Sequence, residues 1–185
     1  AHFDISSKIQ NINPVIKTLN YFLNKKNISI LNIKKKNNQF HARHSAKKRS
    51  YIYLIRNNIS RSVLNRNREW HIINKININL IKKGALKLLG THDFSTFRAS
   101  NCNSSSPIKT IYKINISKKN NLIKMRFVSK SFLKSQVRSM VGCLKYLGEK
   151  KWTLHKFEQV LKSRNRKYCA PLAPPHGLYL EKVTY

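Results

Sequence analysis

The stretch "YKINISKKNNLIKMRF", residues 112–127, indicates the centre of the expected fold. Apolar and polar residues alternate on both sides of the polar run 118–121, which has the composition of a turn. Because successive side chains of a strand point to opposite faces, this alternation predicts an antiparallel hairpin with one apolar face and one hydrated, basic face. The apolar face consists of Tyr112, Ile114, Ile116, Ile123, Met125 and Phe127.

Helices are predicted before and after this hairpin along the chain. Apolar residues recur at helical spacing over residues 133–147 and over residues 80–89, where Gly90 is expected to end the helix. A shorter helix is predicted over residues 154–161, because Thr153 is a favourable N-cap.

Two further segments complete the predicted sheet. Residues 49–56 are apolar at both odd and even positions, which is typical of a central, buried strand, and residues 178–185 form a final strand. The expected order is strand, helix, strand, strand, helix, strand, with one extra helix. The sequence therefore predicts an α+β fold, with a mixed, mainly antiparallel sheet and flanking helices, in the βαββαβ order of ferredoxin-like and RNA-recognition domains.

The residues before this pattern look like the tail end of a first domain. Apolar residues at helical spacing follow Pro14, with Asn13 as the expected cap, and residues 24–33 then alternate like a short strand. We therefore expect residues 1–38 to be the remnant of one domain and residues 39–185 to form a second.

The charge of the chain points to a polyanionic partner. The 185 residues carry 38 Lys and Arg but only 6 Asp and Glu, a formal net charge of +32 spread along the sequence. An abundance of Lys, Asn and Ile is typical of AT-rich coding sequence, but that bias does not explain the scarcity of acidic residues. A domain with this much self-repulsion is expected to bind nucleic acid.

Other classes of protein lack support in the sequence. Cys102, Cys143 and Cys169 lie far apart without a C-x-x-C pair, which predicts reduced packing thiols in a cytoplasmic protein rather than a zinc module. No apolar run approaches the roughly 18 residues of a membrane span, and no secretory leader is visible. The histidines have no metal-ligand spacing, and no glycine-rich phosphate loop is present.

Two residues are candidates for chemistry on RNA. Tyr51 shares one face of its predicted strand with Arg49 and Tyr53, so its ring could stack on a flipped-out base; the alternative is a core tyrosine with a satisfied hydroxyl. Arg138 stands beside the apolar stripe of its helix, on the flank that also carries Lys134. Its guanidinium could hold a carboxylate or phosphate, or it could belong to a solvated face.

The segment "GTHDFSTFRAS", residues 90–100, contains a carboxylate beside two aromatic residues. We expect Asp93 to satisfy backbone donors of a short helical turn rather than to act as a nucleophile or general base. For Arg98, a phosphate contact and a structural hydrogen-bonding role remain equally open.

Four segments, taken together and in this order, resemble the tRNA pseudouridine synthases of the TruA type. They are "FHARHSAKKRSYIY" (40–53), "GTHDFSTFRASNCNSSSPIKTI" (90–111), "SFLKSQVRSMVGCL" (131–144) and "APPHGLYLEKVTY" (173–185). The resemblance implies the pseudouridine synthase fold and isomerisation of uridine to pseudouridine in the tRNA anticodon stem-loop, at tRNA positions 38, 39 and 40. It also implies a homodimer and the use of no metal and no cofactor.

The resemblance assigns roles to the candidate residues. It implies that Tyr51 packs on the target uracil, that Arg138 pairs with the catalytic aspartate, and that Leu178 and Leu180 line the uracil pocket. It further makes residues 1–38 part of an N-terminal synthase subdomain and residues 39–185 the catalytic, tRNA-binding subdomain. The surface implied to hold the tRNA stem includes Arg43, Arg49, Arg98 and Lys134.

One departure from the family is substantial. The family's nucleophilic aspartate lies in an R-T-D-A-G-V-H-A loop, which would precede His2-Phe3-Asp4 and is not in this sequence. Asp4 and Asp93 match other positions of the family. We therefore expect this chain to be the C-terminal portion of a synthase and to be inactive on its own. Smaller departures are His44 and Gln136, where the family usually has Phe and Met.

A non-catalytic RNA-binding module of the same fold is the alternative function. The segment "KMRFVSKSF", residues 124–132, lacks the glycines and aromatic spacing of the RNA-recognition signature, which argues against it.

Overall fold

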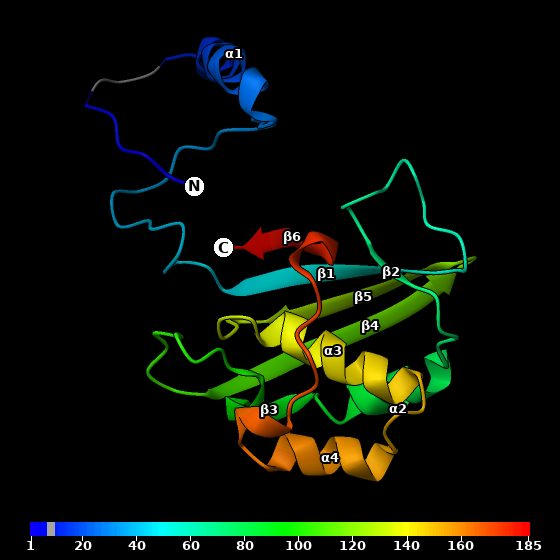
Figure 1. The fold of residues 1–185 in the computed structure, drawn as a ribbon. Helices are drawn as coiled ribbons and strands as arrows, with labels where there is room; N and C mark the ends of the chain where they lie inside the picture. Colours follow the sequence, from blue (N-terminus) through cyan, green and yellow to red (C-terminus); the bar gives the residue numbers. More distant parts are fainter. Residues whose placement is uncertain (7–9) are drawn as a thin grey trace. The chain divides into compact units, whose positions relative to one another are not determined.

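The computed structural model describes residues 1–6 and 10–185, which form two compact units, Ala1–Ala46 and Lys47–Tyr185. Among these residues, no helix has the length and apolar character needed to cross a membrane. The elements of the first unit are α1 (Ile12–Leu23) and the 3-10 turn η1 (Asn24–Lys26). Figure 1 shows both units as ribbons.

The first unit contains the predicted helix but not the predicted strand. α1 begins two residues earlier than expected, because Asn11 rather than Asn13 is the cap and accepts a hydrogen bond from the Asn13 backbone N–H. Residues 24–33 form η1 and irregular structure, so the predicted strand is wrong. The side-chain amide of Asn20 donates to the Ile30 carbonyl at 3.0 Å and accepts from the Ile30 N–H at 2.6 Å, so these backbone groups are satisfied without a partner strand.

The sheet of the second unit confirms the predicted fold. β1 (Lys48–Asn57) is central and pairs antiparallel with β5 (Leu122–Ser129) and with β6 (Leu178–Thr184). β4 (Ile108–Lys119) lies beyond β5, so the four predicted strands follow the spatial order β6-β1-β5-β4. All three pairings are antiparallel, as in a ferredoxin-like βαββαβ sheet.

Two short strands were not expected. β2 (Trp70–Ile72) pairs parallel with the end of β1, and β3 (Gly90–Asp93) pairs antiparallel with the start of β4. Each has three or four residues, which is too short for an alternating pattern.

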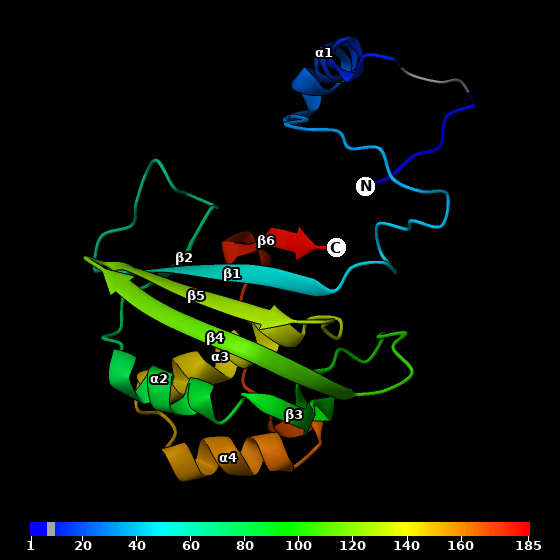
Figure 2. The ribbon, with the colours of Figure 1, turned by 180° about the vertical axis from the view of Figure 1, so that it is seen from behind.

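Three helices lie on one side of this sheet, and the last of them packs against the other two, as Figures 1 and 2 show from opposite sides. They are α2 (Ile78–Leu86), α3 (Gln136–Gly148) and α4 (Leu154–Lys162), and the remaining 3-10 turns are η2 (Ser95–Phe97), η3 (Arg166–Tyr168) and η4 (Pro175–Gly177). The predicted cap of α4 is confirmed, because the Thr153 hydroxyl accepts from the Lys156 N–H at 3.1 Å. α2 ends four residues before Gly90, which instead begins β3 with a positive φ of 91°.

The alternation of the hairpin is confirmed in β5 and interrupted in β4. Ile123, Met125 and Phe127 are fully buried beneath the helices. In β4 a register shift between Ile111 and Lys113 places Ile111 in the core and leaves Tyr112 48% exposed. The expectation that Tyr112 belongs to the apolar face is therefore wrong, because one extra residue at a bulge reverses the side-chain direction.

Candidate active site

Tyr51 lies in the middle of the sheet, on the face that the helices cover. It stands opposite Phe127 of β5 and Leu180 of β6, and it shares this face with Arg49 and Tyr53 as expected. Its ring meets the ring of Phe132 edge to face, with 5.3 Å between the centroids. The ring is half-buried, so neighbours on both strands and on the β5–α3 connection fix its orientation.

Tyr53 is a fully buried core residue with a satisfied hydroxyl, which donates to the Pro174 carbonyl at 2.7 Å. Burial raises the pKa of this hydroxyl well above its ordinary value, and the positive charge of Arg138 acts in the opposite direction. A core tyrosine with a satisfied hydroxyl was the alternative considered for Tyr51, and it is Tyr53 that has these properties.

Arg138 projects from α3 toward the residues that lead into β6. Its Nε donates to the Ala173 carbonyl at 2.7 Å, and the Ala173 N–H donates back to the Arg138 carbonyl at 3.3 Å. In the part of the chain that the structure describes, neither terminal nitrogen of this guanidinium has a hydrogen-bond partner. The guanidinium is thus anchored at one nitrogen and open at the other two.

Tyr53 and Arg138 both donate to carbonyls of the 170–177 segment. This segment crosses α3 on its way to β6 (Figure 1). Two glycines allow its close approach. A Cβ at Gly142 of α3 would lie 2.2 Å from the Pro171 carbonyl oxygen, and one at Gly177 would lie 2.8 Å from the Leu54 carbonyl oxygen. Because both obstacles are backbone atoms, neither glycine can carry a side chain without moving the segment.

The two predicted pocket leucines lie in β6 beside the tyrosines. Leu178 stands opposite Tyr53 and packs against the core, whereas Leu180 stands opposite Tyr51 and is 54% exposed. Strand pairing thus brings Leu180 beside Tyr51 and Leu178 beside Tyr53. Arg138 lies near enough to Tyr53 for its charge to act on the Tyr53 hydroxyl.

The basic candidates occupy several places. Arg49 donates to the Lys130 carbonyl at 2.6 Å, close to the connection that carries Phe132. Lys134 has an exposed side chain, and its backbone N–H donates to the Cys102 sulfur at 3.3 Å. Arg43 is exposed in the first unit.

Arg98 has a structural hydrogen-bonding role, which was one of the two possibilities considered for it. Its Nη2 donates to the Cys102 carbonyl at 2.7 Å and to the Ser104 carbonyl at 2.6 Å. The side chain therefore folds the loop that follows it, and a contact with tRNA phosphate stays a prediction.

Asp93 behaves as predicted. Its Oδ1 accepts from the Ser95 N–H at 2.8 Å at the start of η2, and its Oδ2 lies 3.7 Å from the Arg164 Nε. Partial burial raises the pKa of this carboxyl, but the hydrogen bonds from Ser95 and the charge of Arg164 bring the net pKa below its ordinary value. The carboxylate is committed to this turn.

Sequence reasoning missed the residues that hold the site together. Phe132, Ala173 and Pro174 were not candidates, although each lies in a segment that had been singled out. For Phe132, an aromatic residue shortly before the arginine helix was an available signal. For Ala173 and Pro174 no signal was available, because they contribute only backbone carbonyls.

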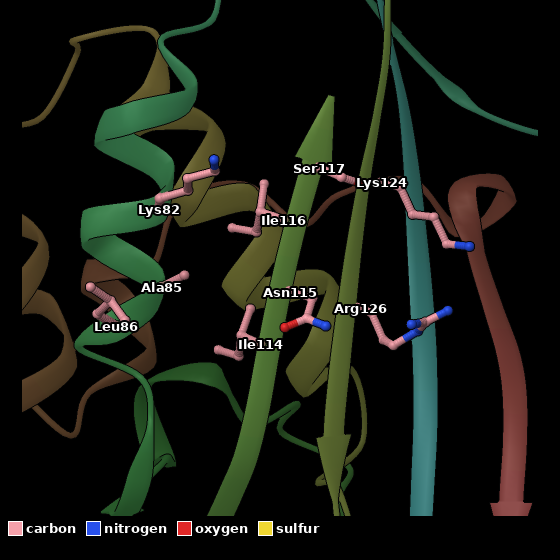
Figure 3. Close-up of a pocket in the computed structure, with 9 residues that line it drawn as sticks. All are labelled: Lys82, Ala85, Leu86, Ile114, Asn115, Ile116, Ser117, Lys124 and Arg126. Carbon is pink, nitrogen blue, oxygen red and sulfur yellow. The ribbon is translucent and has the colours of Figure 1, made fainter. Parts of the chain in front are cut away.

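A separate groove of about 640 Å³ lies between α2 and β4 (Figure 3). Lys82 comes from the helix side, whereas Lys124 and Arg126 extend from β5 on the other side of β4. The groove contains none of the predicted site residues and no carboxylate or thiol. It is therefore a basic surface feature and not the candidate active site.

The fold is consistent with a domain of the pseudouridine synthase class. A family model described as tRNA pseudouridine synthase matches residues 85–185. Over all 185 residues the chain is 58% identical to tRNA pseudouridine synthase A of Pelagibacter ubique and 40% identical to that of Ehrlichia chaffeensis, and it covers 75% of each. It is 39% identical to the Brucella ovis protein of the same name, over 85% of the chain and 63% of that protein. The chain belongs to the tRNA pseudouridine synthase family, a family of isomerases.

Proposed function

We propose that this protein provides the tRNA-binding and uracil-binding part of an enzyme that converts uridine to pseudouridine in the anticodon stem-loop of tRNA. The observation that carries the proposal is the Arg138 guanidinium, which is anchored to the Ala173 carbonyl and has two open nitrogens. The family relationship supports tRNA as the substrate class.

Arg138 is suited to bind a carboxylate in one orientation. Its Nε is already used, so a carboxylate would meet the two terminal nitrogens end-on, with one oxygen for each. Such a pair keeps the carboxylate ionised and fixes its direction. In the proposed reaction this carboxylate is the catalytic aspartate, and the family resemblance supports its pairing with Arg138.

Tyr51 is suited to bind the base. Its ring is held by Phe132 and lies beside the exposed apolar side chain of Leu180. An aromatic ring and an aliphatic side chain at one place provide a stacking surface for a flipped-out uracil. The isomerisation breaks the bond from ribose to the ring nitrogen and forms one to carbon 5, so the base must turn while it remains bound.

The carboxylates of this chain do not supply the nucleophile in this proposal. Of the six acidic residues, five form ion pairs with neighbouring Lys or Arg side chains. The five paired residues are Glu69, Asp93, Glu149, Glu158 and Glu181. The sixth, Asp4, belongs to the first unit. We propose that an aspartate from outside these 185 residues completes the site and that the chain alone is inactive.

The test is pseudouridine formation on unmodified tRNA transcripts. The 185-residue chain is compared with a version extended upstream by its genomic sequence. Activity in the extended version alone, lost when the aspartate of the added segment is changed to Asn, is the expected result. Equal activity of the 185-residue chain would overturn the proposal that the nucleophile lies outside it.

The second candidate function is an RNA-binding module without catalysis, which the net charge of +32 favours. Tight, salt-sensitive tRNA binding by both versions, with pseudouridine formed by neither, would establish this function instead.

Three finer features are part of the same proposal. Residues 1–38 would belong to the N-terminal synthase subdomain and residues 39–185 to the catalytic subdomain. The enzyme would act as a homodimer in the cytoplasm and would need no metal or cofactor. The family resemblance supports each of these features.

A further inference from the structure

Two cysteines face each other where the 170–177 segment begins. Cys143 of α3 is fully buried, and its sulfur lies 3.5 Å from the sulfur of Cys169, which is half-buried at the end of η3. The Ala170 N–H donates to the Cys143 sulfur at 3.4 Å and fixes the start of the segment beside α3. These thiols were expected to be separate packing residues, but the fold makes them a pair.

A guanidinium completes the cluster. Nη1 of Arg166 lies 3.1 Å from the Cys169 sulfur and 2.7 Å from the Ser139 hydroxyl oxygen. A neighbouring cation favours the thiolate form, which is the reactive form of cysteine. The hydrogen bond from Cys143, with Arg166 and Ser139, brings the pKa of the Cys169 thiol below its ordinary value despite burial. The same sulfur–sulfur hydrogen bond and burial raise the pKa of Cys143, which keeps its proton.

We propose that Cys143 and Cys169 are an oxidisable dithiol, which hydrogen peroxide converts to a disulfide between α3 and the 170–177 segment. The Cys169 thiolate attacks one peroxide oxygen, the O–O bond breaks, and hydroxide leaves and is protonated to water, so that Cys169 becomes a sulfenic acid. The Cys143 sulfur then attacks the Cys169 sulfur, the S–O bond breaks, and the departing hydroxide takes the Cys143 proton as water. One peroxide and two thiols give one disulfide and two molecules of water.

The geometry requires only a small movement. A disulfide bond is about 2.05 Å long, so the sulfurs must approach by roughly 1.5 Å. Cys169 is partly accessible to a small oxidant, whereas Cys143 is fully buried. The order of the two steps therefore follows from exposure as well as from charge.

The disulfide would act on the candidate active site. The segment that it fixes carries the Ala173 and Pro174 carbonyls, which accept hydrogen bonds from Arg138 and Tyr53. Oxidation would restrict this segment and so change how far the Arg138 guanidinium can adjust to a carboxylate. This effect on catalysis rests on the proposed function, whereas the oxidation itself does not.

The experiment is peptide mapping by mass spectrometry after treatment of the folded, reduced protein with hydrogen peroxide and alkylation of the remaining thiols. We expect a peptide pair joined through Cys143 and Cys169, lighter by two hydrogen atoms, while Cys102 is alkylated. A matched control is Cys102→Ser, which removes the third thiol and should leave the disulfide unchanged. Alkylation of Cys143 and Cys169 while Cys102 is oxidised would overturn the proposal, as would a disulfide that forms only in urea.

Two variants test the order of the steps. In Cys143→Ser, Cys169 should accumulate as a sulfenic acid that dimedone traps, whereas Cys169→Ser should leave Cys143 reduced. Arg166→Ala should slow disulfide formation several-fold, because the thiolate loses its cation. Equal rates with and without Arg166 would count against the site. These readouts need no catalytic activity, so a failure of the disulfide and a failure of the proposed function are distinguishable.

Discussion

Arg138 of α3 and Tyr53 of β1 donate hydrogen bonds to successive peptide carbonyls, those of Ala173 and Pro174, each at 2.7 Å. The donors come from a helix and from the central strand, and the acceptors belong to one irregular segment. The side chain that is proposed to orient the nucleophile and the core of the sheet are thereby fixed to the same short piece of backbone. Its displacement would affect both.

Arg138→Ala should reduce pseudouridine formation by the upstream-extended protein by about 100-fold or more, because an electrostatic contact to the reacting carboxylate is lost. Arg138→Lys should restore little of the activity, since an ammonium group cannot present two nitrogens in a plane. The measurement is the single-turnover rate on a tRNA transcript, with tRNA affinity determined in parallel.

The control for Arg138 is Arg164→Ala, which removes an arginine whose side chain is 72% exposed and pairs with Asp93. It should keep near-normal activity. A loss of tRNA affinity in Arg138→Ala with an unchanged rate on bound tRNA would contradict the proposed role and indicate a phosphate contact.

Tyr53→Phe should lower the free energy of unfolding by about 1 to 2 kcal/mol, because the partly buried Pro174 carbonyl loses its donor while the packing of the ring is kept. The measurement is urea unfolding followed by circular dichroism. Tyr112→Phe is the matched control, since that ring is 48% exposed at the β4 bulge and its change should have almost no effect. Equal stability of both variants would mean that the Tyr53 hydroxyl contributes nothing to the fold.

The sequence predicted most of the elements around the core but not the departures from regular structure. Alternation identified β5, and helical spacing identified α3 and α4, because each of these elements buries one continuous face. The β4 bulge was not predictable, since pairing with β5 and not local preference places the extra residue. The strand predicted over residues 24–33 failed because Asn20 satisfies the backbone of Ile30.

The sequence indicated the side chains of the candidate site, but it did not indicate the backbone carbonyls that hold them. Tyr51 and Leu180 were named from separate motifs, and β1–β6 pairing places them side by side. The partner of Arg138 is a carbonyl 35 positions away along the chain, a relationship that leaves no signature in residue type. The cysteine pair was missed for a related reason, since 26 positions separate two thiols that meet only in the folded protein.

Gly142→Ala should destabilise the fold by about 1 to 3 kcal/mol, because the new methyl group would lie 2.2 Å from the Pro171 carbonyl oxygen and must displace the 170–177 segment. On helix propensity alone the change would be favourable, so the sign of the effect is diagnostic. The measurement is the midpoint of thermal unfolding. Leu86→Ala on the exposed side of α2 is the control and should change it little. A higher midpoint for Gly142→Ala would show that the segment can move away from α3 at no cost.

Glu149 should make the stability of the protein depend on pH in the acidic range. Its carboxylate side chain is 2% exposed and lies 2.9 Å from the Lys145 ammonium and 3.0 Å from that of Lys151. Burial raises the pKa of this group, but the ion pairs with the two lysines and the hydrogen bond from Asn74 outweigh burial and bring the pKa below its ordinary value of 4.5. A folded-state pKa below the unfolded one means that the unfolded chain binds the proton first.

The contribution of Glu149 to the free energy of unfolding is therefore complete above pH 4.5. It is lost as the pH falls through the lower pKa of the folded state. Glu149→Gln should lower the free energy of unfolding at pH 7 and flatten its decline toward pH 3, because the variant has no proton to take up at this position. The measurement is urea unfolding at several pH values. Glu158→Gln, in which a more exposed carboxylate loses its pairing with Lys87, should show a smaller change of slope. Parallel curves for the wild type and Glu149→Gln would show that this ion pair contributes no acid sensitivity.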